Sequence, residues 1–112
     1  MAPHMDMDTA HKTDQYLRQT FEIIAAHMKE YPARIYLFGS RASGTARIFS
    51  DCDIGIEPLR NLPVGHLSRL REKLEESRVP YVVEVVDLSQ ANEEFARKVR
   101  GEGILWIDTS NA

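Results

Sequence analysis

The chain has 112 residues, of which 43% are hydrophobic, and its formal net charge is −3. This length and composition suit one folded domain with its own core and exclude a disordered chain. The acidic balance and the lack of a long basic run argue against direct contact with nucleic acid. No apolar run approaches the roughly 18 residues of a membrane span, and the single cysteine, Cys52, cannot form an internal disulfide. We therefore expect a cytoplasmic protein that does not bind a membrane.

The N-terminal part of the chain divides into a dispensable segment and the first helix. Residues 1–12 read as a tag remnant followed by a flexible N-terminus, and residues 13–112 as a single domain. Apolar residues then recur at helical spacing, which predicts an amphipathic helix over about Thr13–Glu30 that Pro32 ends.

The rest of the chain alternates short apolar runs with amphipathic segments. The expected elements are a strand over Arg34–Phe38, a short helix after Ser40, a strand over Ser50–Glu57, a helix over about Val64–Ser77, a strand over Tyr81–Leu88, and a helix that opens at Asn92 and closes at Gly101. The apolar run Ile104–Ile107 fits either a strand or a helix end. This order predicts an α/β fold, a small mixed sheet of three to four strands with helices packed on one face. The other face would hold the site.

The residues between Phe38 and Glu57 carry the chemistry. Asp51 and Asp53 are two apart, and a strand turns residues i and i+2 to the same face. Cys52, Ile54 and Ile56 would then point the other way, into a core. Two such carboxylates repel each other unless a cation lies between them, and Mg²⁺ takes carboxylate and phosphate oxygens as ligands. Just ahead of them, Gly39 permits a tight turn, and Ser40 offers a hydroxyl and a backbone N–H to a phosphate. Either half alone is more often a plain loop or turn, but together they indicate a nucleotide–Mg²⁺ site.

A third carboxylate is needed if metal ions are to activate a hydroxyl and stabilise the transferred phosphoryl group. Glu84 lies between two pairs of valines, where an unpaired charge is costly, and a metal-linked general base would explain it. Asp87, the alternative, lies at the end of the same strand, where capping a turn is the simpler role. Arg41 either neutralises a phosphate or only covers the surface, and the sequence does not decide between these roles.

The spacing Gly39-Ser40, ten residues, Asp51-x-Asp53 resembles the signature of the DNA polymerase β-type nucleotidyltransferase superfamily. The small size is similar to that of the minimal nucleotidyltransferases, the antitoxin partners of HEPN-domain toxins. The resemblance implies two Mg²⁺ ions as cofactors and ATP as substrate. It implies catalytic and metal-binding roles for Asp51, Asp53 and Glu84, with Asp87 as the alternative third carboxylate, and nucleotide binding by Gly39, Ser40 and Arg41. The family usually has Asp at the position of Glu84.

The same resemblance implies transfer of AMP to a tyrosine of a partner HEPN toxin. Because the chain has no separate acceptor domain, the acceptor must come from a partner protein or a second copy of the chain. The apolar residues Ile104, Leu105 and Trp106 are candidates for this contact or for packing within the chain. Two alternatives are an antitoxin that acts by binding alone, and a half-sized aminoglycoside-type nucleotidyltransferase completed by a partner subunit.

Overall fold

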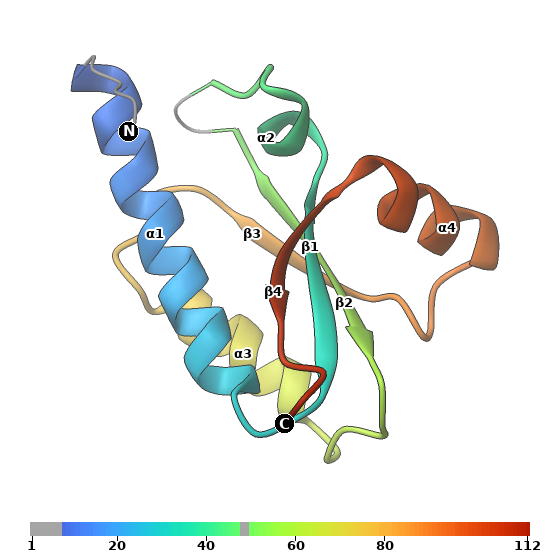
Figure 1. Ribbon diagram of the computed structural model, residues 1–112. Helices are drawn as coiled ribbons and strands as arrows, with labels where there is room; N and C mark the ends of the chain where they lie inside the picture. Colours follow the sequence, from blue (N-terminus) through green and yellow to red (C-terminus); the bar gives the residue numbers. More distant parts are fainter. Residues whose placement is uncertain (1–7, 48–49) are drawn as a thin grey trace.

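A computed structural model describes residues 8–47 and 50–112. They form α1 (Asp8–Met28), β1 (Ala33–Phe38), α2 (Ser40–Ser43), β2 (Cys52–Pro58), α3 (His66–Glu75), β3 (Val83–Asp87), α4 (Glu93–Glu102) and β4 (Ile104–Asp108) (Figure 1). These elements agree with the predicted ones except at their ends and at β4. The expected tag remnant lies within residues 1–7, which are outside the described residues. Residues 8–12, which were expected to belong to a flexible N-terminus, instead form the start of α1. None of the described helices is both long and apolar enough to span a bilayer.

The four strands form one mixed sheet in the order β3-β2-β1-β4. Strand β1 runs antiparallel to both β2 and β4, and β2 runs parallel to β3. The predicted α/β fold with a small mixed sheet is therefore confirmed. The run that the sequence left unplaced is the edge strand β4, which pairs Ile104 with Leu37 and Asp108 with Arg34.

The main core lies between the sheet and helices α1 and α3 (Figure 1). Alternate residues of β2 point into it, namely Cys52, Ile54 and Ile56, and all three are fully buried. This confirms the predicted alternation along the strand. Burying one aliphatic side chain contributes about 1.5–3 kcal/mol, so this layer fixes which face of β2 remains for the acidic residues.

Helix α4 lies on the opposite face of the sheet, which corrects the expectation that all helices share one face. Its Ala96 and Val99 pack against Tyr36 in a second, smaller cluster. The space for α4 comes from Gly55, because a Cβ there would lie only 3.1 Å from Val99 Cγ1. The helix covers part of this face and leaves Asp53 half-exposed.

The start of α4 agrees with the prediction, but its end does not. Its start is the predicted one, since the Asn92 side chain accepts hydrogen bonds from the N–H groups of Glu94 at 2.8 Å and Phe95 at 3.2 Å. Its end is two residues later than predicted, because Gly101 lies inside the helix and Gly103 ends it. Gly103 passes so close to the carbonyl oxygens of Val99 and Leu37 that a side chain would not fit there, and the chain turns directly into β4.

Candidate active site

The turn after β1 brings the backbone of Gly39 against a carboxylate. Gly39 has φ of 74°, a conformation that other residues rarely adopt. A Cβ built on it would overlap the side chain of Asp53. The carbonyl of Gly39 accepts hydrogen bonds from the N–H groups of Ala42 and Ser43, both at 3.1 Å, and Ser40 begins the short helix α2. Glycine is thus required here both by the backbone conformation and by the close approach of Asp53.

Three side chains form a row across the sheet at this level. Phe38 on β1 is the register partner of Asp53 on β2, and Asp53 is the register partner of Glu84 on β3. Register partners point to the same face, and neighbouring strands lie about 4.8 Å apart. The row lies on the face opposite to Cys52. It therefore places the second predicted aspartate between an aromatic ring and a second carboxylate.

The charges in this row are unfavourable to one another. Burial raises the pKa of Asp53 above its ordinary value, and the negative charges of Glu84 and Asp51 raise it further. Asp51 lies just ahead of β2 and is exposed. The three predicted carboxylates are thus near enough to interact, and a proton or a cation among them would relieve the repulsion.

The donor atoms suit Mg²⁺, but they do not form a closed cage. Carboxylate oxygens are the ligands that this ion takes, usually with substrate phosphates and water completing its shell. Among the residues whose side chains the structure describes, 15–47 and 50–112, no three His, Cys, Asp or Glu side chains form a group that could hold a metal ion. Asp51, Asp53 and Glu84 thus supply the type of donor atom that Mg²⁺ takes, and binding of the ion by them stays a prediction.

Glu84 lies beside Asp53, where a third carboxylate was predicted, but the predicted apolar setting of Glu84 is wrong. The sequence suggested an apolar setting, but Glu84 is exposed on the edge strand β3. Its neighbours Val83 and Val85 point to the opposite face, where Val85 is buried in the main core. Strand alternation, and not a burial cost, brings Glu84 beside Asp53.

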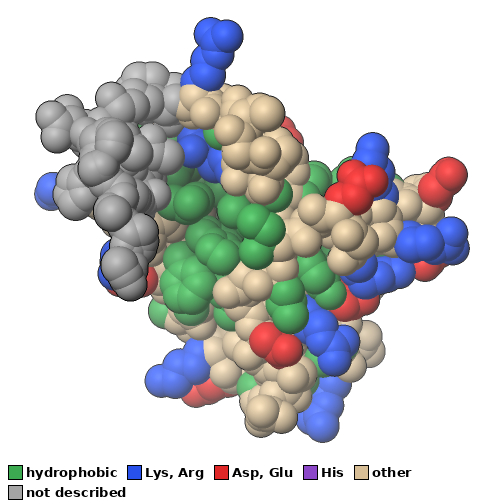
Figure 2. Space-filling view, turned by 45° about the horizontal axis from the view of Figure 1, so that its top comes forward, with side chains coloured by type: hydrophobic (Ala, Val, Ile, Leu, Met, Phe, Trp, Pro, Cys, Tyr) green, Lys and Arg blue, Asp and Glu red, His purple; other side chains and the backbone are tan. Residues whose placement is uncertain are grey.

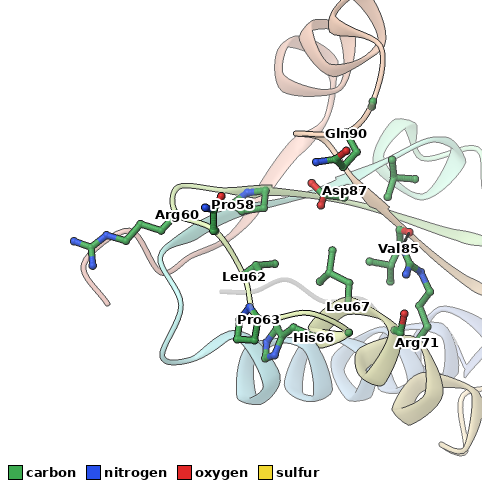
Figure 3. A pocket seen from close by; sticks show the side chains of 15 residues that line it. Pro58, Arg60, Leu62, Pro63, His66, Leu67, Arg71, Val85, Asp87 and Gln90 are labelled. Atoms are coloured by element: carbon green, nitrogen blue, oxygen red, sulfur yellow. Dashed lines mark hydrogen bonds between the residues drawn. The ribbon is translucent and has the colours of Figure 1, made fainter.

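Asp87 lies three residues further along β3 and therefore on the other face. Its Oδ1 accepts hydrogen bonds from the N–H of Ser89 at 2.9 Å and from the Ser89 hydroxyl at 2.6 Å. It borders a pocket of about 820 Å³ at the carboxyl ends of β2 and β3 (Figure 3). Neither Asp53 nor Glu84 lines this pocket. The structure thus brings Glu84, and not Asp87, to Asp53, and the turn-capping role expected for Asp87 is the one it has.

Arg41 holds the loop that leads to the aspartates. Its guanidinium lies 4.0 Å over the ring of Tyr81 and donates a hydrogen bond to the carbonyl of Ser50 at 2.6 Å. Tyr81 belongs to the main core, on the face that Cys52 occupies. The sequence gave no sign of this stacking, because the two residues are forty positions apart. Contact of Arg41 with a phosphate stays a prediction.

The chain is similar to known proteins in sequence and in fold. The sequence profile of the family described as "Polymerase beta, Nucleotidyltransferase" matches residues 11–112. The chain is 33% identical over 66 residues to the Haemophilus influenzae protein named "Probable protein adenylyltransferase MntA". That match covers 59% of this chain and 58% of the relative, less than two thirds of its length.

Solved toxin–antitoxin complexes resemble the chain in three dimensions. One contains AMP-PNP and has a TM-score of 0.64 at 28% identity, covering 81% of this chain and 75% of that chain. Another is a tri-AMPylated HEPN toxin of Shewanella oneidensis in complex with its MNT antitoxin, with a TM-score of 0.63. This second likeness covers 88% of this chain and 75% of that chain at 22% identity, and it extends to the fold alone.

Proposed function

Because the chain belongs to the polymerase beta nucleotidyltransferase family, we propose that it transfers AMP from ATP to a hydroxyl of a partner protein, with Mg²⁺ as cofactor. The proposed partner is a HEPN-type toxin and the proposed acceptor a tyrosine, so that the protein acts as an antitoxin. The name of the Haemophilus influenzae relative and the AMP-PNP complex support this proposal. The observation that carries it is the carboxylate row Asp53–Glu84 beside the backbone of Gly39.

In the proposed reaction, the acceptor oxygen attacks the α-phosphorus of ATP. The bond from that phosphorus to the oxygen bridging to the β-phosphate breaks, pyrophosphate leaves, and the hydroxyl proton passes to the carboxylate of Glu84. Glu84 is exposed on an edge strand, so a hydroxyl on another molecule can reach it. Asp51 and Asp53 would hold Mg²⁺, which when bound would neutralise charge on the phosphates. Gly39 and Ser40 would position the triphosphate.

The proposal is tested by adding Mg²⁺ and ATP to the protein together with the toxin and weighing both by intact-protein mass spectrometry. We expect the toxin to gain the mass of one AMP or a few, and little product to form without it. The double variant Asp51→Asn, Asp53→Asn should add none. Glu72→Gln, which alters an exposed carboxylate on α3, should leave transfer unchanged.

Two outcomes would assign another function. If the toxin is neutralised without a mass change, and equally by the double variant, the protein is an antitoxin that acts by binding alone. If AMP is added to an aminoglycoside and not to the toxin, the protein is a small-molecule nucleotidyltransferase. The use of ATP and the free thiol of Cys52 favour the cytoplasm as the compartment.

A further inference from the structure

A pocket of about 510 Å³ lies between α2 and α4, directly beside the proposed phosphate-binding turn. Its lining includes Phe38 and Gly39 at the end of β1, and Phe95, Lys98 and Glu102 on α4. Such a volume lies within the range of small-molecule pockets, which are typically apolar with a few polar groups. From this pocket we infer that Phe38 and Phe95 bind the adenine base of ATP. The inference rests on the proposed function, and it adds the base-recognition subsite.

The position of the pocket along the carboxylate row supports this assignment. Across the sheet the order is Glu84, Asp53, Phe38, so the proposed general base and the pocket lie on opposite sides of Asp53. Strand spacing separates the strands of Glu84 and Phe38 by about 10 Å. With the phosphates above Asp53, an acceptor that reaches Glu84 occupies the β3 side. The nucleoside would then lie on the β1 side of Asp53, next to the pocket.

The lining provides a stacking surface. The rings of Phe38 and Phe95 meet edge to face, with centroids 5.7 Å apart and an interplanar angle of 79°. Phe95 is 38% exposed, although it is a large apolar residue. Stacking on a base would remove that surface from water, and aromatic side chains bind bases in this way.

The rim of the pocket includes one cationic and one anionic side chain. Lys98 and Glu102 are four residues apart on α4 and therefore neighbours on its surface. Lysine donates hydrogen bonds and an ionised glutamate accepts them. The edge of adenine carries both an amino donor and ring-nitrogen acceptors. The rim therefore complements the base, while the floor of the pocket stacks on its rings.

Calorimetry with two probes separates base recognition from phosphate recognition. Mg²⁺–ATP and Mg²⁺–tripolyphosphate are titrated into the wild type, Phe95→Ala and Phe95→Tyr. We expect Phe95→Ala to weaken ATP binding about tenfold or more and to leave tripolyphosphate binding unchanged. Phe95→Tyr, which keeps the ring, should bind ATP nearly as well as the wild type. The matched control is Leu59→Ala, which truncates an apolar residue of similar exposure, 40%, outside the pocket and should change neither affinity. Circular dichroism checks each fold.

The possible failures are distinct. If the wild type binds ATP and Phe95→Ala binds it equally well, the base lies elsewhere and only this inference is overturned. If Phe95→Ala keeps its ATP affinity but loses transfer to the toxin, the pocket receives the acceptor ring and not adenine, which also overturns it. Equal losses of ATP and tripolyphosphate binding would contradict a base-specific role. If the wild type binds neither probe, the proposed function itself fails.

Discussion

Without a bound metal ion, the ionised carboxylate of Asp53 destabilises the folded protein. Its pKa is raised by burial and by the charges of Glu84 and Asp51, so the folded state holds its proton more tightly than the unfolded state does. At neutral pH, ionised Asp53 therefore costs stability, and the cost disappears once the pH falls below its ordinary pKa. We expect Asp53→Asn to raise the thermal midpoint in EDTA at pH 7.5, and the gain to vanish near pH 3.

Differential scanning fluorimetry measures this effect, with Glu72→Gln as the control for removing an exposed charge. A fall in the midpoint for Asp53→Asn at pH 7.5 would mean that the ionised carboxylate is stabilised within the chain. The repulsion deduced from its neighbours would then be absent.

Glu84 and Asp87 are the two candidates for the general base. They lie on opposite faces of β3, and only Glu84 is the register partner of Asp53. We expect Glu84→Gln to slow single-turnover transfer by about 10²–10⁴-fold, the usual contribution of a general base, with ATP affinity largely kept. Asp87→Asn should retain near-normal transfer. A dead Asp87→Asn beside an active Glu84→Gln would reverse the assignment.

Strand alternation predicted which side chains of β2 are buried, because its period of two is fixed by the backbone. It also explains why Glu84 reaches Asp53, although flanking valines made the residue look buried. Four apolar residues in a row, as in Ile104–Ile107, carry no such period, so β4 was not predictable. Nor was the side taken by α4, which depends on Gly55 leaving room for Val99 across the sheet.

The contact between α1 and α3 contains a pair of histidines whose interaction the sequence did not indicate. The rings of His27 and His66 stack with centroids 4.0 Å apart. The Nε2 of His27 lies 2.7 Å from the carbonyl oxygen of His66, and the Nε2 of His66 lies 3.0 Å from the carbonyl oxygen of His27. Because a carbonyl oxygen can only accept, each Nε2–H is the donor. The pKa of His66 is lowered, first by burial and then by His27, with smaller effects of Arg69 and Lys73.

This pair predicts that the fold is less stable in mild acid. Because the folded pKa of His66 is depressed, the unfolded chain takes up the proton more readily, and stability is lost as the pH falls below about 6.5. We expect the urea midpoint to be lower at pH 5.5 than at pH 8. His66→Gln should show a smaller difference between the two conditions. An unchanged difference in this variant would place the pH dependence in other groups.

The two edges of the sheet have different surfaces. The β3 edge carries the exposed carboxylate Glu84, whereas the β4 edge carries Ile104 and Leu105, which are 46% and 49% exposed. Trp106 instead packs edge to face on Phe21 of α1, with centroids 5.2 Å apart. Trp106 thus packs within the chain, whereas contact of the exposed Ile104 and Leu105 with a partner stays a prediction. Figure 2 shows hydrophobic side chains gathered on one face of the molecule, with charged ones around them.

The β4 edge is where we expect the partner protein to bind. Leu105 is the register partner of Tyr36, so it lies on the face of the sheet that carries Asp53. A protein seated there can extend over the carboxylate row and supply the acceptor hydroxyl. Side chains that become fully buried at the centre of an interface are the ones whose truncation weakens binding most.

The double variant Ile104→Ser, Leu105→Ser should therefore weaken binding of the toxin by about tenfold or more. It should leave Mg²⁺–ATP affinity unchanged, because neither residue lines the pocket beside Gly39. Calorimetry measures both affinities. Val64→Ser serves as the control, since Val64 is 98% exposed and apolar but lies in the loop before α3. If the double variant binds the toxin as tightly as the control does, the partner docks on another surface. The exposed β3 edge beside Glu84 would then be the one to test.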